Sequence, residues 1–171
     1  TDIAIQSDGK ILIAGKFGSV NGVTRSGIAR ILPTGYVDPT FNPPYWVNSL
    51  NKSYEFICIQ DDGKILTGNN PISRLNSDGS LDNSFNFGSI NGEIYSAAVQ
   101  NDGKIIIGGS FTYGLSSKNF ARINTDGSFD NTFNVGYGPN NRLYATELQD
   151  DGKILIGGDF TSLNGIGKNR V

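Results

Sequence analysis

The stretch NDGKIIIGGSF, residues 101–111, decides the fold because it occurs along the chain in four versions. The other three begin with Asp-Gly-Lys triplets at Asp8, Asp62 and Asp151. The copies lie about 40 to 55 residues apart, close to the repeat lengths of β-propeller blades. An internal repeat is therefore the first feature of the architecture.

Each repeat contains apolar blocks in a fixed order, with the pattern of strands rather than of helices. The first block ends in Gln, an Asp-Gly turn follows, and the second block returns as a Lys-Ile-Leu/Ile run. Asp-Gly between two apolar runs is a strong hairpin signal. The third block contains an arginine, and a second turn, such as Asp126-Gly127, leads into an outer segment that we expect to form a fourth strand.

The returning runs are apolar on both faces, as in a sheet packed between other sheets. The sequence therefore predicts an all-β fold, a β-propeller built from four-stranded antiparallel blades, with about three and a half blades present. We expect residues 1–171 to be part of a single β-propeller repeat domain within a larger polypeptide or assembly. The predicted blades span about residues 1–42, 54–86, 94–134 and, for an incomplete fourth blade, 143–171.

These blocks resemble the delta-60-repeat β-propellers, whose units read approximately Gln-x-Asp-Gly-Lys-Ile-Leu-x-Gly-Gly-x-Phe and then Ala-Arg-Leu-Asn-x-Asp-Gly-Ser-x-Asp-x-Thr-Phe-Asn. The third repeat matches from Gln100 to Phe111 and from Ala121 to Asn134, whereas the second has Asn-Asn-Pro at 69–71 in place of Gly-x-Phe. The resemblance covers essentially the whole chain. It implies a repeat domain of large secreted bacterial surface proteins or phage virion proteins without assigned chemistry.

Composition narrows the possible partners. The net charge of −2 and the isoelectric point near 5.0 argue against nucleic acid, which needs clustered Lys and Arg. No apolar run reaches the length of a membrane helix, so we expect no membrane insertion in this segment. The Gly-, Asn- and Ser-rich, Cys-poor repeats favour an extracellular, cell-surface or virion location. We expect other protein chains or surface glycans as partners.

One arginine and one aspartate recur in phase in each repeat. A charged feature present once per blade indicates a structural ion pair, since forked Arg–carboxylate contacts fix geometry; the alternative is a charged ring that binds a ligand. These structural repeat residues are Arg30, Arg74, Arg122, Asp38, Asp82 and Asp130.

Catalytic and metal-binding patterns are weak. The chain contains no histidine, which removes Ser-His and Cys-His catalysis, and we predict no catalytic residue. Residues 124–130 resemble a short calcium loop, but the glutamate ligand of an EF-hand has no counterpart; we predict neither a metal nor a cofactor. The alternative is a glycoside hydrolase or lyase that uses Glu147, because the other repeats carry Ala4, Cys58 and Ala98 at this position.

Aromatic residues in the connections are the best binding candidates, because exposed aromatic rings stack on sugars and anchor protein interfaces. The candidates are Tyr45, Trp46, Tyr113 and Tyr137. Packing between blades is the alternative fate of these rings. The sequence therefore predicts a non-catalytic scaffold that binds protein or glycan through loops, especially residues 43–51 and 113–118.

Overall fold

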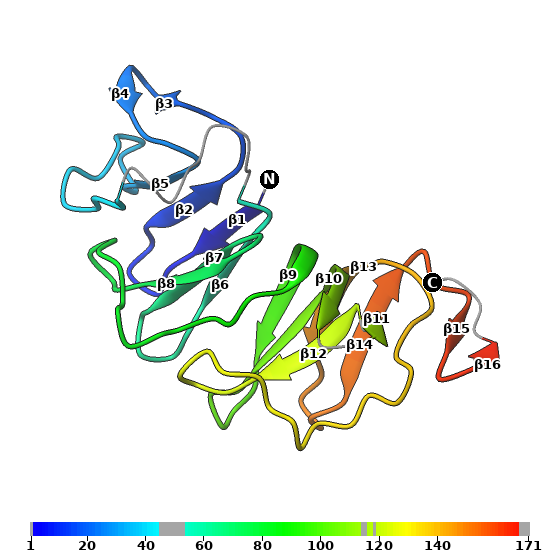
Figure 1. Cartoon of the computed structure of the whole chain (residues 1–171). Coiled ribbons are helices and arrows are strands. Elements are labelled where there is room, and N and C mark those ends of the chain that lie inside the picture. Colours follow the sequence, from blue (N-terminus) through cyan, green and yellow to red (C-terminus); the bar gives the residue numbers. More distant parts are fainter. Residues whose placement is uncertain (1, 45–53, 114–115, 118, 168–171) are drawn as a thin grey trace. The chain divides into compact units, whose positions relative to one another are not determined.

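The computed structural model describes residues 2–44, 54–113, 116–117 and 119–167. The chain divides into two compact units, Thr1–Asn83 and Ser84–Val171, which we call unit 1 and unit 2. Both units are built from short antiparallel strands (Figure 1). Each unit is described by itself.

Unit 1 contains two three-stranded sheets and one small hairpin. The strands of the first sheet, in spatial order, are β1 (Asp2–Ile5), β2 (Ile11–Ala14) and β5 (Ile28–Ile31). Those of the second are β6 (Phe56–Ile59), β7 (Ile65–Gly68) and β8 (Ile72–Leu75). The hairpin consists of β3 (Ser19–Val20) and β4 (Val23–Thr24). The apolar blocks of the first two repeats thus form matching sheets.

Unit 2 contains the third and fourth copies of the motif. The third copy forms a sheet of β9 (Asn91–Val99), β10 (Ile105–Tyr113), β11 (Ser116–Ser117) and β12 (Phe120–Ile123). The fourth copy forms two pairs, β13 (Leu143–Leu148) with β14 (Ile154–Gly158), and β15 (Ser162–Leu163) with β16 (Ile166–Gly167). Strand β13 lies against β9, so the first strands of two successive repeats are neighbours.

The first Asp-Gly turn has the same construction in every copy. In the third copy the Asp102 carboxylate accepts a hydrogen bond of 3.0 Å from the Lys104 N–H, and the Gly103 N–H donates to the Gln100 carbonyl at 2.8 Å. Gly103 has a φ of +80°, which glycine adopts without the steric cost that a side chain would add. The turn residues therefore fix the hairpin, as predicted.

The short fourth strand expected in each blade is a single bridge in the first three copies. The bridges pair Ile31 with Val37, Leu75 with Leu81, and Ile123 with Phe129. The aspartate that follows the third bridge, Asp130, accepts hydrogen bonds from the Thr132 N–H and hydroxyl at 2.9 and 2.6 Å. This local turn bends the backbone away from the ladder.

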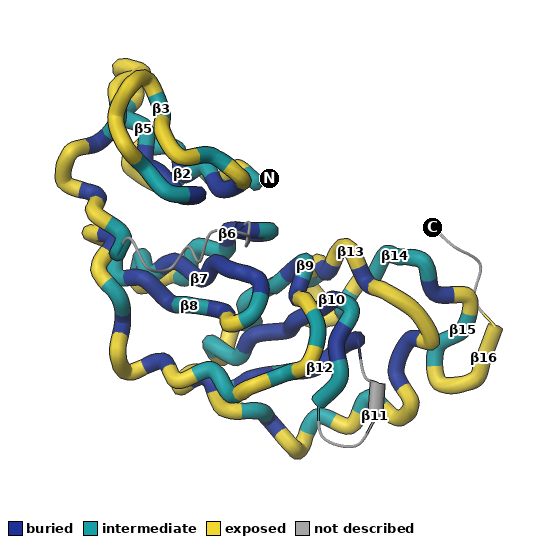
Figure 2. Tube along the Cα trace, turned by 45° about the horizontal axis from the view of Figure 1, so that its top comes forward, coloured by how far each residue is buried: buried dark blue, intermediate teal, exposed yellow. Residues whose placement is uncertain are grey.

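Each unit has its own apolar core. Buried side chains of the unit 1 core include Leu12, Ile28, Phe41 and Leu75. The unit 2 core is built around Ile106, Phe120, Leu143 and Phe160. The central strands β7 and β10 are among the most buried segments (Figure 2). Their side chains are therefore committed to packing.

The all-β antiparallel fold class is confirmed, and the described residues form no helix. In particular, none of their elements is a helix with the length and apolar character needed to cross a membrane. The middle connections of the first and fourth copies differ from the simple loops expected, because each forms a two-residue hairpin. The arrangement of all repeats in one propeller domain remains a prediction.

Candidate functional site

The recurring arginines and aspartates form ion pairs in three blades. The Arg30 Nε lies 2.9 Å from Asp38 Oδ2, the Arg74 Nε 2.7 Å from Asp82 Oδ2, and the Arg122 Nε 2.9 Å from Asp130 Oδ2. In each blade the lysine of the Asp-Gly-Lys turn joins the same carboxylate, at distances of 3.7, 3.1 and 2.8 Å for Lys10, Lys64 and Lys104. All three aspartates are buried, so these carboxylates are part of the framework.

Asp130 has every strong acceptor position occupied. Its Oδ2 accepts from Lys104 and Arg122, and its Oδ1 accepts from Thr132. The hydrogen bonds from Lys104 and Thr132 hold the pKa of the Asp130 carboxyl well below its ordinary value. A carboxylate in this state remains ionised and is unsuited to act as a general acid near neutral pH.

Arg30 links two blades as well as two segments of its own blade. Its guanidinium donates to the Ser77 carbonyl oxygen in the second blade. The same guanidinium lies 4.7 Å from the centroid of the buried Phe41 ring. Next to it, the Asn42 N–H donates to the Asp78 carbonyl at 3.1 Å. In unit 1 this arginine therefore fixes successive repeats to each other.

The aromatic residues that were predicted to bind partners differ in their exposure and packing. Tyr45 and Trp46 lie outside the described residues, as does most of the 43–51 connection. Tyr137 is 86% exposed. Tyr113 is half-buried, and its ring stacks on Phe129 with centroids 3.5 Å apart and an interplanar angle of 12°. One face of Tyr113 is therefore used in packing, whereas Tyr137 is free to contact a partner.

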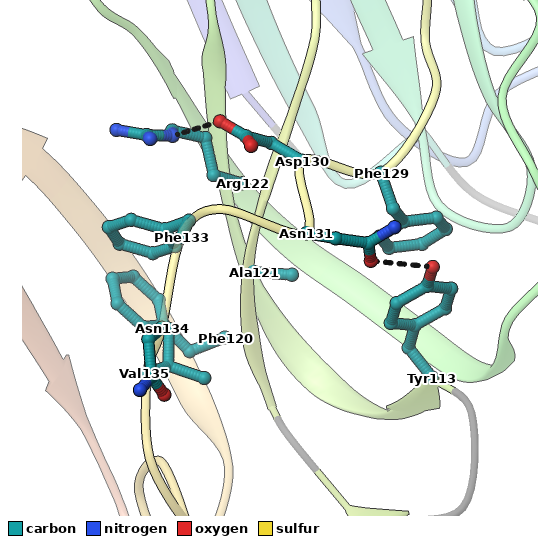
Figure 3. Close-up of a pocket in the computed structure, with 10 residues that line it drawn as sticks. All are labelled: Tyr113, Phe120, Ala121, Arg122, Phe129, Asp130, Asn131, Phe133, Asn134 and Val135. Carbon is teal, nitrogen blue, oxygen red and sulfur yellow. Dashed lines mark hydrogen bonds and ion pairs between the residues drawn. The ribbon is translucent and has the colours of Figure 1, made fainter.

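A pocket of about 320 Å³ opens beside Tyr113 (Figure 3). The Tyr113 and Phe129 rings form one side of it, and Phe120 and Phe133 lie on the other. The Tyr113 hydroxyl donates to Asn131 Oδ1 at 3.3 Å. An aromatic hollow lined by a few polar groups has the composition of a small binding site. It contains one of the predicted residues, Tyr113.

The candidate calcium loop is an ordinary polar turn. Asp126 Oδ1 accepts from the Ser128 N–H at 2.9 Å and from its hydroxyl at 2.7 Å. The equivalent Asp78 accepts from Ser80 in the same way. Within the described residues no group of three or more His, Cys, Asp and Glu side chains is placed to hold a metal. The Asp126 and Asp78 carboxylates are therefore used in hydrogen bonds within their own turns.

Glu147, the candidate acid of the enzymatic alternative, is exposed on β13. No ion pair among the described residues involves it. It does not line the pocket beside Tyr113. The geometry therefore does not join Glu147 to the aromatic hollow.

Two tyrosines that the sequence reasoning missed form a cluster on neighbouring strands of unit 2. The rings of Tyr95 on β9 and Tyr144 on β13 have centroids 5.6 Å apart and are tilted by 33°. The Tyr95 hydroxyl donates to Glu93 Oε2 at 2.9 Å, and the Tyr144 hydroxyl donates to Asp159 Oδ2 at 2.8 Å. We call Glu93, Tyr95, Arg142, Tyr144 and Asp159 the tyrosine cluster.

A signal for this cluster was present in the sequence. Tyr95 and Tyr144 each precede the Gln that ends the first block, Gln100 and Gln149, by the same number of residues. They therefore occupy equivalent positions of two successive repeats. The earlier repeats have Thr1 and Glu55 there, so the aromatic pair belongs to the third and fourth copies.

The comparisons agree with the repeat pattern. The family described as a domain of unknown function (DUF5122) beta-propeller matches residues 6–41, 60–85, 100–133 and 149–171. Among curated proteins, no sequence matches the chain. Each family segment begins at the Gln of a Gln-x-Asp-Gly turn, and together the segments cover more than half of the chain. The chain therefore belongs to the DUF5122 beta-propeller family.

Proposed function

We propose that this chain is a non-catalytic interaction domain, a rigid β-propeller scaffold that binds surface glycans or proteins through residues that differ between its repeats. The observation that carries the proposal is that recurring charged residues have structural contacts, whereas exposed aromatic residues do not recur in every repeat. The aspartates that recur in the first three blades are buried and paired with arginines, whereas the exposed tyrosines Tyr36, Tyr137 and Tyr144 do not recur in every repeat. A fold of this kind hosts many functions, so the variable residues decide the activity.

The recurring charges support a structural rather than a catalytic use. Asp38 is 2% exposed and Arg30 6% exposed, so neither group is presented to a substrate. Within unit 1, Arg30 donates both to Asp38 and to the carbonyl of Ser77. Because catalysis needs ionisable groups that face the substrate, these residues support a scaffold.

The variable residues support binding. Tyr137 and Tyr144 are exposed, and the pocket beside Tyr113 presents aromatic carbon together with amide groups. Aromatic residues of this kind supply a large contact area with little loss of conformational freedom. We place contacts with partners on this set of side chains.

The setting that we propose is a larger extracellular protein. The resemblance to the delta-60 repeats supports a bacterial cell-surface or adhesin-like protein, or a phage tail or fibre protein of the virion. Stacked repeats form a rigid support on which loops hold binding residues in fixed positions. Glycans and protein chains at a cell surface are the partners that this setting offers.

The test separates binding from turnover. The protein is incubated with insoluble cellulose, chitin and peptidoglycan, and retention and newly formed reducing ends are measured together. We expect retention on at least one polymer without release of reducing ends. Release that is lost in Glu147→Gln but kept in Asp150→Asn, a matched exposed acid near the same hairpin, would establish the hydrolase alternative instead.

A further inference from the structure

We propose that the tyrosine cluster of unit 2 is a binding site for a neutral carbohydrate. This inference rests on the proposed function, because it names one ligand class and one site for the binding scaffold. The site is distinct from the pocket beside Tyr113, whose lining residues include no member of the cluster. Three features of the cluster carry the inference: its backbone, its polar groups and its exposure.

Tyr95 and Tyr144 each lie in a β-bulge, and this sets the direction of both side chains. The pairing of β9 with β10 passes from Ser96–Gly108 to Ile94–Gly109, so Tyr95 is the extra residue of a β-bulge. The pairing of β13 with β14 passes from Ala145–Gly157 to Leu143–Gly158, which makes Tyr144 the extra residue there. A β-bulge redirects the side chain of its unpaired residue and is frequent beside binding and active sites.

Glycine opposite each bulge makes this backbone possible. A Cβ placed on Gly109 would lie 2.1 Å from the Glu93 carbonyl oxygen, and one on Gly158 would lie 2.1 Å from the Arg142 carbonyl oxygen. The second repeat has Asn69 at the matching position, and its β6–β7 pairing ends at Phe56–Gly68, before the position of the bulge. The bulges of the third and fourth copies therefore both depend on a glycine that the second repeat lacks.

The polar groups fit a neutral polyhydroxylated ligand. Glu93 and Asp159 each accept one tyrosine hydroxyl, and an ionised carboxylate has further acceptor positions for the hydroxyl groups of a sugar. Arg142 lies beside the cluster because its carbonyl accepts a hydrogen bond of 3.0 Å from the Asp159 N–H. Tyr144, and to a smaller extent Tyr95 and Asp159, raise the pKa of its guanidinium. This group supplies donors for sugar oxygen atoms.

The same groups disfavour a charged ligand. An anion would approach the carboxylates of Glu93 and Asp159, and a cation would approach the guanidinium of Arg142. A sugar donates to the carboxylates, accepts from the guanidinium and places its C–H face on an aromatic ring. The combination of both charges around two rings therefore selects a neutral ligand more readily than an ionic one.

The rings are accessible without rearrangement. Tyr144 is 47% exposed, and Tyr95 is half-buried against it. Burial and the hydrogen bond to Glu93 raise the pKa of Tyr95, so its hydroxyl stays protonated and keeps donating to that carboxylate. The orientation of the cluster is thus set before a ligand arrives.

The experiment titrates the intact 171-residue protein with maltohexaose, cellohexaose and N-acetylchitohexaose by saturation-transfer NMR and calorimetry. Oligogalacturonate and chitosan oligomers serve as the acidic and basic probes. We expect at least one neutral probe to bind, and Tyr144→Ala to weaken its binding by about tenfold, as for loss of an aromatic anchor. Tyr144→Phe keeps the ring but releases Asp159, and should give a smaller loss. The matched control is Tyr36→Ala, which removes a tyrosine that is 73% exposed in unit 1.

The outcomes separate this inference from the proposed function. Binding of none of the neutral probes, or tighter binding of a charged probe, overturns the carbohydrate site. Binding that is unchanged in both Tyr95→Ala and Tyr144→Ala, with the fold intact by circular dichroism, also overturns it but leaves the binding scaffold standing. Cleavage of a probe would instead refute the non-catalytic proposal.

Discussion

Replacement of Asp38 by alanine removes the carboxylate that holds Arg30 in unit 1. Asp38 Oδ2 accepts from the Arg30 Nε at 2.9 Å, and its Oδ1 accepts from the Thr40 N–H at 2.9 Å and the Thr40 hydroxyl at 2.7 Å. Lys10 lies 3.7 Å from the same carboxylate. The substitution therefore leaves a buried guanidinium without its main counter-ion.

The expected decrease in the free energy of unfolding follows from the burial of the Arg30–Asp38 ion pair. Removal of one partner of a buried ion pair costs about 3–5 kcal/mol, because the remaining charge is uncompensated. We expect the lower end, about 3 kcal/mol, because Arg30 keeps its contact with the Ser77 carbonyl and Thr40 is exposed to water. Asp38→Asn keeps an acceptor for Thr40 and should cost less than Asp38→Ala.

Two measurements check this prediction. Urea denaturation followed by far-UV circular dichroism gives the change in the free energy of unfolding. Hydrogen exchange at the Asn42 amide, which donates to the Asp78 carbonyl, reports locally on the contact between the first two blades. The control is Asp61→Ala, an exposed acid in the neighbouring turn, with an expected change within about 0.5 kcal/mol. A loss below about 1 kcal/mol for Asp38→Ala, with unchanged exchange at Asn42, would refute the structural role of the pair.

Burial would raise the pKa of Asp38, but hydrogen bonds from Thr40 and the Arg30 charge lower it from 3.8 to about 2. The ionised Asp38 carboxylate therefore stabilises the fold above about pH 4, and this contribution is lost as the pH falls toward 2. The urea midpoint of the unaltered protein should fall over this pH range, and the part of the fall that is due to Asp38 should be absent in Asp38→Asn. Gly127→Ala should destabilise by about 1–3 kcal/mol more than Gly152→Ala: both have positive φ, but only the Gly127 Cβ would meet backbone, at 2.8 Å from Asn86. Equal melting shifts would contradict the close approach. Calcium should leave the melting temperature unchanged relative to EDTA, and a calcium-specific rise absent with magnesium would reverse the assignment of the Asp-Gly turns.

The repeat made the main strands predictable because turn chemistry and strand pattern agree in every copy. Asp102-Gly103 gives a hairpin on local grounds, and the apolar run of β10 requires burial on both faces. The in-phase recurrence of Arg122 and Asp130 likewise pointed to the observed ion pair. Hairpins and ion pairs that depend on local chemistry and recur in several repeats can therefore be predicted from one sequence.

The features that were missed depend on finer backbone geometry. Asn21-Gly22 and Asn164-Gly165 are strong hairpin signals, and both pairs have positive φ, yet their flanking runs are only two residues long. The short fourth strand is reduced to a bridge in the third copy, where the Asp130 N–H still donates to Arg122 but the Asp130 carboxylate accepts from the Thr132 N–H. The sequence showed the polar side chain but not which hydrogen bond it would prefer.

The tyrosine cluster was hidden for a different reason. Tyr95 and Tyr144 lie in strands, where an aromatic residue is ordinarily interpreted as core. Only the register of the two hairpins shows that each is a bulge residue. A search for residues that share one repeat position in some blades but not in others would have found the pair.

The most direct test of the central claim, binding without chemistry at non-repeated residues, is an NMR titration of isotopically labelled protein with a bound neutral oligosaccharide. Amide shifts locate the ligand, and the sugar's anomeric signals in the same tube report any cleavage. The account predicts shifts centred on residues 93–95, 142–144 and 159, with the oligosaccharide intact throughout. Shifts centred instead on the recurring ion pairs of Arg30 with Asp38 and Arg74 with Asp82, or new reducing-end signals that disappear in Glu147→Gln, would contradict it. Shifts centred on the pocket beside Tyr113 would overturn only the site assigned to the tyrosine cluster.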